Sequence, residues 1–170
     1  MSGLRVERVG YGHEHARQLI DQVQDEYRAL YGGPDETPLE PEMFEPPTGS
    51  FFVGYVEEDG AQVPVATGAW RSHLDLDEPG LGRIAEIKRM YVVPSHRGRG
   101  LSKQMLAHLE RDAVAAGFDS LVLETGTMQP TAIALYTAAG YGPVTPYGHY
   151  KCAPESVHLG RRLRPLEQAG

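Results

Sequence analysis

The stretch IAEIKRMYVVPSHRGRGLSKQML, residues 84–106, decides the architecture of this chain. Its first ten residues are mostly apolar and end at Pro94, which predicts a strand that stops where proline removes a backbone donor. From Leu101 onward apolar residues recur at helical spacing until Gly117, which predicts an amphipathic helix. The apolar run SLVLE, residues 120–124, then predicts a short strand suited to a sheet interior. The order is therefore strand, helix, strand.

The turn between this strand and this helix has the composition of an anion-binding loop. It places two glycines and a series of backbone N–H groups where a helix begins, and Arg97 and Arg99 add positive charge. A helix start attracts a phosphate because its first N–H groups are unpaired and the helix dipole is positive there. The loop is not a mononucleotide P-loop, since Ser102 precedes Lys103, and it lacks the third glycine of a dinucleotide fingerprint at position 103.

The rest of the chain predicts one domain over residues 1–170, with an α/β (α+β) fold. A Gly pair at 32–33 ends the first predicted helix, and the pair Asp59-Gly60 predicts a tight hairpin turn. The expected elements are a strand at 4–9, a helix at 13–31, an acidic loop at 34–47, hairpin strands at 51–56 and 63–70, a turn-rich loop at 75–82, a helix at 130–139, and strands at 141–144 and 157–163.

Composition narrows the partners and the compartment. The chain has 16 basic and 23 acidic residues, a formal net charge of -7, which disfavours nucleic acid and anionic lipid as partners. A lone cysteine, Cys152, forms no internal disulfide, and the histidines show no metal-ligand spacing, so we expect no metal. Residues 1–12 lack the apolar core of a signal peptide. We therefore expect a cytoplasmic protein without a membrane partner.

Two motifs in residues 85–144 resemble the GNAT family of N-acetyltransferases. Arg97, Gly100 and Ser102 match the family's phosphate loop, although Ser102 replaces the usual final Gly or Ala. In ALYTAAGY, residues 134–141, a Tyr precedes a Gly and an aromatic residue as in the family's second motif. The resemblance implies a single-domain, mixed and mostly antiparallel central sheet flanked by helices. Within it the strands at 84 and 120 run parallel but splay apart.

The resemblance also implies acetyl-CoA as acyl donor, bound in the gap between the splayed strands. Tyr136 matches the family's general acid, and Glu86 stands near the family's glutamate base. Glu86 alternates with Lys88 along one strand face, so from the residues alone a cross-strand or same-face ion pair of Glu86 is the alternative to a base role. The expected cofactor-binding residues are Met90, Tyr91, Val92, Arg97, Gly98, Arg99, Gly100, Leu101, Ser102 and Gln129, the last standing where many members have Asn.

The acceptor is the least determined feature. It is expected to be the primary amine of a small molecule or a peptide. Arg71 and Arg89 on adjacent strands could grip a carboxylate, whereas the acidic loop at 35–45 could attract a cationic amine. A non-catalytic acyl-CoA-binding regulatory module is the alternative function. The acyl chain length stays open, as does a homodimer.

Overall fold

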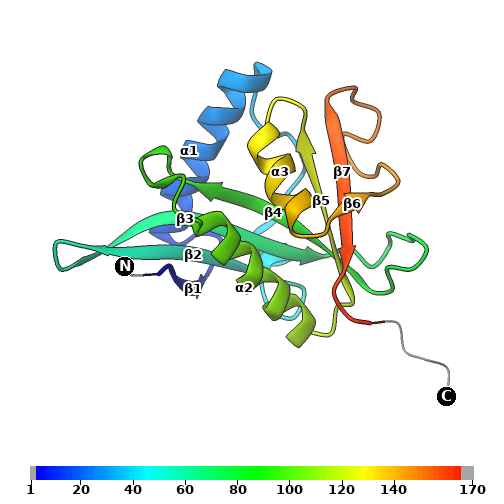
Figure 1. Cartoon of the computed structure of the whole chain (residues 1–170), viewed down its shortest axis with the longest axis horizontal. Coiled ribbons are helices and arrows are strands. Elements are labelled where there is room, and N and C mark those ends of the chain that lie inside the picture. Colours follow the sequence, from blue (N-terminus) through cyan, green and yellow to red (C-terminus); the bar gives the residue numbers. More distant parts are fainter. Residues whose placement is uncertain (1–2, 166–170) are drawn as a thin grey trace.

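The computed structural model describes residues 3–165, which form one seven-stranded sheet with helices on both faces (Figure 1). The strand order is β1-β2-β3-β4-β5-β7-β6. The strands are β1 (Arg5–Val9), β2 (Gly49–Glu58), β3 (Ala61–Ser72), β4 (Ile84–Val92), β5 (Ser120–Gly126), β6 (Gly142–Pro143) and β7 (Ser156–Arg162). The helices are α1 (Glu14–Tyr31), α2 (Leu101–Ala115) and α3 (Pro130–Ala138), with 3-10 turns η1 (Pro41–Phe44) and η2 (Pro94–His96).

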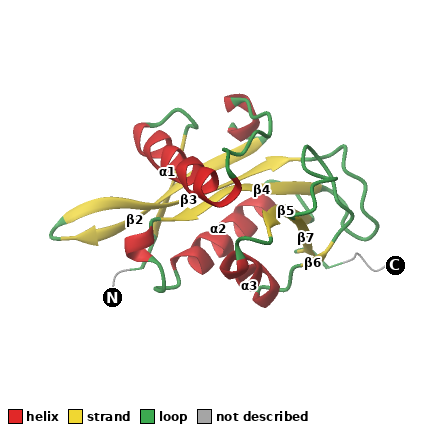
Figure 2. Cartoon of the chain, turned by 90° about the horizontal axis from the view of Figure 1, so that it is seen from above, coloured by secondary structure: helices red, strands yellow, loops and turns green. Residues whose placement is uncertain are grey.

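The helices cover opposite faces of the sheet because each has one apolar face to bury. Figure 2 shows α1 on one face and α2 and α3 on the other. Leu19 and Val23 of α1 pack in a core that includes Phe51 of β2, whereas Met105 and Leu109 of α2 belong to the opposite core. A left-handed glycine at position 32 ends α1 and directs the chain back over the sheet.

The pairing of β4 positions the functional site. Strands β1 to β4 form an antiparallel series, whereas β4 and β5 are parallel. This parallel pairing covers only residues 84–86 of β4 against 120–122 of β5. Beyond Glu86 the two strands diverge, as Figure 1 shows, and β5 instead pairs along its whole length with β7. The splayed parallel pair and the mostly antiparallel sheet expected from the sequence are thus confirmed.

Sequence patterns located the central elements better than the edges. The strand at 84, the helix at 101 and the strand at 120 all begin where the sequence predicted. The predicted strand at 141–144 shrinks to two residues, because it pairs with β7 only at Gly142 and Pro143. The acidic loop contains η1, and Phe44 of η1 is buried in the core that α1 forms with β2. Among the helices in residues 3–165, none combines the length and hydropathy of a membrane span.

Candidate active site

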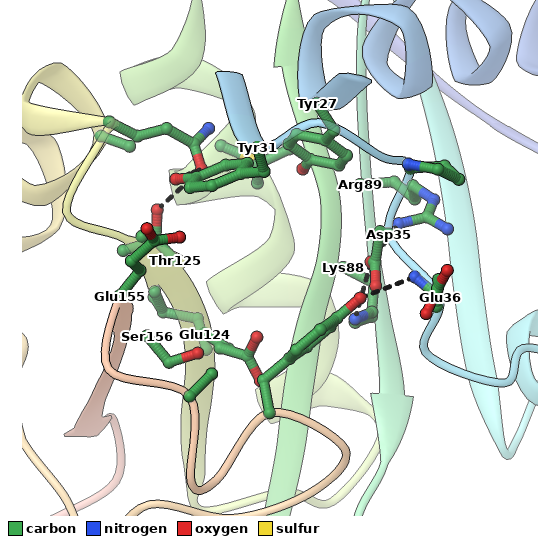
Figure 3. A pocket seen from close by; sticks show the side chains of 18 of the residues that line it. Tyr27, Tyr31, Asp35, Glu36, Lys88, Arg89, Glu124, Thr125, Glu155 and Ser156 are labelled. Atoms are coloured by element: carbon green, nitrogen blue, oxygen red, sulfur yellow. Dashed lines mark hydrogen bonds and ion pairs between the residues drawn. The ribbon is translucent and has the colours of Figure 1, made fainter. Parts of the chain in front are cut away.

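A cavity of about 430 Å³ lies in the gap where β4 and β5 diverge (Figure 3). Its walls are residues 87–90 of β4 and 123–126 of β5. The end of α1 with the following loop, residues 31–36, closes one side. Side chains of α3 and of the loop that precedes β7 complete the lining. Segments far apart in the sequence therefore meet at one opening in the sheet.

The β4 wall of this cavity carries a bulge. The register between β3 and β4 shifts between Thr67 and Ala69, and Arg89 there adopts a φ of 56°. The Thr67 hydroxyl donates to the Arg89 carbonyl over 2.7 Å, which holds the bulge in place. Of the predicted β4 contacts only Met90 lines the cavity, whereas the Tyr91 and Val92 side chains pack into the two cores. Any role of these two residues would therefore be through their backbone.

The predicted phosphate loop is open at the start of α2. Gly98 and Gly100 have φ values of 79° and 75°, which favour glycine, and no side chain caps the helix. The N–H groups of the first turn, at Leu101 and Ser102, therefore lack a capping acceptor. Arg97 is directed elsewhere, since its guanidinium donates to the Val92 carbonyl and to Glu26 of α1, both over 2.9 Å. Arg97 thus secures the loop, while Arg99 is exposed.

Two of the predicted site residues, Tyr136 of α3 and Gln129 directly before α3, line the cavity. Tyr136 is 5% exposed, and burial raises its pKa above the ordinary value, so the phenol keeps its proton at neutral pH. The Gln129 side-chain oxygen accepts a hydrogen bond from the Tyr31 hydroxyl over 3.2 Å. Tyr31 reaches this position because Gly126 has no Cβ, which would overlap the hydroxyl. The end of α1 is thereby joined to α3 across the gap.

Glu86, the predicted base, lies outside the cavity lining and is bound in an ion pair across the sheet. Its carboxylate accepts a hydrogen bond from Arg71 Nε over 2.9 Å, and only 4% of its side chain is exposed. The pair forms because the two residues are opposite each other in the β3–β4 register. The expected alternative of a cross-strand or same-face ion pair is confirmed in its cross-strand form, with Arg71 rather than Lys88 as the partner. Nor does Arg71 join Arg89 at the cavity, because only Arg89 lines it.

Glu124 of β5 is the cavity carboxyl group that sequence reasoning missed. It faces the gap, as Figure 3 shows. Its side chain is 18% exposed, and its carboxylate lies 3.4 Å from His158 Nε2. Burial is the main cause that raises the pKa of Glu124 to about 7; the charge of Lys88 opposes this rise, and the charges of Asp35 and Glu86 contribute to it. The sequence SLVLE contained a pattern that could have predicted this position. Leu121 and Leu123 point to one core, and because side chains alternate along a strand, Glu124 points to the opposite face near the carboxyl end of β5.

Asp35 connects the loop after α1 to the bulge of β4. Its carboxylate lies 2.7 Å from Arg89 Nη1 and 3.5 Å from Lys88 Nζ, as Figure 3 shows. Burial alone would raise the pKa of Asp35, but the charge of Lys88, the N–H of Thr37 and the charge of Arg89 outweigh it and hold that pKa well below its usual range. The sequence could not pair these residues, which are 54 positions apart.

Asp35→Asn is expected to lower the free energy of unfolding by about 3 kcal/mol, because it leaves the nearly buried Arg89 charge without its partner. Urea denaturation at pH 7 measures this effect. Because the folded-state pKa of Asp35 is lowered, its contribution is fully present above the ordinary value of about 4 and is lost as pH falls through the lowered pKa. The difference between wild type and Asp35→Asn should therefore shrink below about pH 4; a constant difference down to pH 2 would contradict the ion pair.

Comparison with known proteins adds independent support for this arrangement. Residues 17–141 match the family described as Acetyltransferase (GNAT) family. A solved putative acyl-CoA N-acyltransferase from Klebsiella pneumoniae is 28% identical, with a TM-score of 0.72 over 95% of this chain and 98% of that chain. A GNAT acetyltransferase from Elizabethkingia anophelis, solved with acetyl-CoA bound, shares the fold at 14% identity, with a TM-score of 0.59 over 95% of this chain and 99% of that one.

Among curated proteins, the "IAA acetyltransferase" of Azospirillum brasilense is 40% identical over 82 residues, 48% of this chain. The chain spans about half the length of the curated relatives it matches, 54% for that protein and 55% for an uncharacterized N-acetyltransferase of Bacillus subtilis. The family match, by contrast, extends from α1 to the end of the second motif and covers well over half of the sequence. The chain therefore belongs to the GNAT family of acetyltransferases.

Proposed function

We propose that this protein transfers an acetyl group from acetyl-CoA to a primary amine within the cavity between β4 and β5. The observation that carries the proposal is the gap itself, where a half-buried carboxyl group on β5 and a protonated phenol on α3 line one space. Acetyl-CoA is the acyl donor that the GNAT fold binds, as the Elizabethkingia structure illustrates. The chemistry then needs a base, an acid and a polarised carbonyl.

The features around the gap fit this donor. Residues 87–92 of β4 have no β5 partner, so their outward backbone groups are available to pair with the amide groups of the pantetheine arm. At the far end of that edge, the uncapped start of α2 and its two left-handed glycines would hold the pyrophosphate. Gln129 would contact the arm from α3. The sulfur end of the donor would then lie in the cavity.

Glu124 would act as the base, in place of the Glu86 expected from the sequence. Its carboxylate takes a proton from the acceptor ammonium, and the free amine nitrogen attacks the thioester carbonyl carbon. The carbon–nitrogen bond forms, the carbon–sulfur bond breaks, and the Tyr136 hydroxyl protonates the departing thiolate. Backbone N–H groups at the β4 bulge would stabilise the developing oxyanion. The attacking nitrogen loses its second proton to solvent as the amide forms, and Glu124 releases the proton it accepted. The products are an amide and coenzyme A, with Tyr136 reprotonated from solvent and one proton released overall.

Gly100→Val is expected to weaken coenzyme A binding at least about tenfold, because a β-branched residue does not adopt the φ of 75° that aims the first N–H groups of α2. Isothermal titration calorimetry measures the dissociation constant. Gly60→Val is the matched control: its φ is 80°, and as at position 100 no atom lies within 4 Å of an added Cβ. Equal binding by both variants would contradict the phosphate site.

Thiol release from acetyl-CoA, measured with a panel of primary amines, tests the proposed reaction directly. Release that depends on an added amine, with the N-acetyl product identified by mass spectrometry, would support it. Coenzyme A binding without thiol release for any amine would instead support the regulatory-module alternative and contradict acetyl transfer.

A further inference from the structure

We infer that the acceptor is a compact, cationic amine without a carboxylate, rather than an amino acid or the end of a polypeptide. This inference rests on the proposed function, because it concerns the second substrate of the same cavity. Two independent observations carry it, namely how the cavity is closed and how its charges are paired.

The cavity is closed by contacts between segments that an extended peptide would have to separate. The N–H of Glu36, in the loop after α1, donates to the Tyr150 hydroxyl of the loop before β7 over 2.7 Å. The same α1 loop is anchored to β4 by the ion pair of Asp35 with Arg89. In Figure 3, Glu36, Asp35 and Arg89 lie along one side of the cavity. A small amine fits inside this closure, whereas a polypeptide would need an open groove between the two loops.

The cations that could hold a carboxylate are already paired with carboxylates of the protein. Arg71 is bound to Glu86 outside the cavity, and Arg89 is bound to Asp35 with only 3% of its side chain exposed. Lys88 shares Asp35 and is 10% exposed. A carboxylate-bearing acceptor would have to displace one of these pairs or be buried without a partner, and both are unfavourable. Arg71 and Arg89 are therefore not available at the cavity to bind a carboxylate of the acceptor, although the sequence had suggested that role.

The remaining charges of the lining favour a cation. Glu36, Glu124 and Glu155 line the cavity, and among residues 3–165 none of their carboxylate oxygens has a charged lysine or arginine nitrogen within 4.0 Å. An amine that is positively charged in solution is attracted by this field before it loses its proton to Glu124. One donor opposes the trend: Arg89 Nε is buried and lacks an acceptor in the described part of the chain. Because this nitrogen is covered by the protein, it offers no open site for a carboxylate of the acceptor.

Matched acceptors that differ only in the carboxylate or in chain length test the inference. The pairs are phenethylamine against phenylalanine and putrescine against ornithine, with phenylalanyl-glycine as the peptide, each assayed by thiol release with wild-type protein. The kcat/KM of phenethylamine and of putrescine is expected to be at least about tenfold higher than that of the matching amino acid, because the amino acid would bury an unpaired carboxylate in the cavity. Faster turnover of phenylalanine, ornithine or phenylalanyl-glycine would overturn the inference and leave acetyl transfer standing. If no amine causes thiol release, both the inference about the acceptor and the proposed acetyl transfer are overturned.

Two variants test the two observations separately. Tyr150→Phe removes the hydrogen bond to Glu36 and is expected to raise kcat/KM for phenylalanyl-glycine relative to phenethylamine about fivefold. Glu155→Gln is expected to raise KM for putrescine about threefold, while the exposed Glu57→Gln on β2, with the same charge change, leaves it unaltered. An unchanged peptide-to-amine ratio in Tyr150→Phe would overturn the closure, and equal effects of the two glutamine variants would overturn the charge selection.

Discussion

Glu124→Gln is expected to lower kcat at pH 8 by about 100- to 10,000-fold, because the amide cannot accept the proton of the acceptor ammonium. The substitution keeps the shape of the side chain, so the dissociation constant of coenzyme A should stay within about twofold of wild type. Steady-state thiol release and calorimetry on the same preparation measure the two quantities. A large fall in kcat with intact donor binding assigns the loss to chemistry rather than to folding.

Glu86→Gln is the discriminating control, since Glu86 is the base expected from the sequence. It weakens the hydrogen-bonded ion pair with Arg71, where both side chains are largely buried, so it should lower the free energy of unfolding while the folded protein keeps most of its kcat. Loss of turnover in Glu86→Gln with near-normal turnover in Glu124→Gln would reverse the assignment.

The dependence of kcat/KM on pH tests the role of Glu124 in a second way. Because burial raises the pKa of Glu124 to about 7, the protonated and inactive form predominates below pH 7 and the base form above it. The wild-type kcat/KM should therefore rise through neutral pH with an inflection close to that value. The inflection should disappear in Glu124→Gln; its persistence would assign the titration to another group.

Tyr136→Phe is expected to lower kcat by about 100-fold or more, because the thiolate then leaves without a positioned proton donor. Burial raises the pKa of Tyr136 above its ordinary value, so the wild-type phenol stays protonated across the neutral range and is ready to donate. Thiol-release kinetics at saturating acetyl-CoA measure the effect, and coenzyme A binding should be unchanged.

Tyr141→Phe provides the matched control for that experiment. The Tyr141 ring lies 5.7 Å from the Tyr136 ring, but its hydroxyl donates to Glu110 on α2 over 3.0 Å and is not part of the cavity lining. Removing it deletes one hydrogen bond and should leave kcat within about twofold of wild type, with a small loss of stability. Equal kinetic effects of the two variants would contradict an acid role for Tyr136.

Residues 84–141 determined the family and the fold from sequence alone, and they also predicted the position of the donor site. These features follow from local properties: apolar spacing distinguishes strand from helix, and left-handed glycines with free N–H groups mark a phosphate loop at a helix start. Tyr136 and Gln129 were predicted from the family resemblance, and the structure places both in the cavity lining. Glu124 was within reach of local reasoning, through the alternation of SLVLE.

Only the tertiary structure decided which charged side chains meet at the gap. Where β4 and β5 stop pairing, and where the bulge at Arg89 shifts the register, determines whether Glu86 or Glu124 faces the cavity. The partners of Arg71 and Arg89 likewise come from strand register and from a loop 54 residues away. Periodicity shows which face of an element is buried, but the interactions of a charge depend on three-dimensional distances between segments that the sequence leaves far apart.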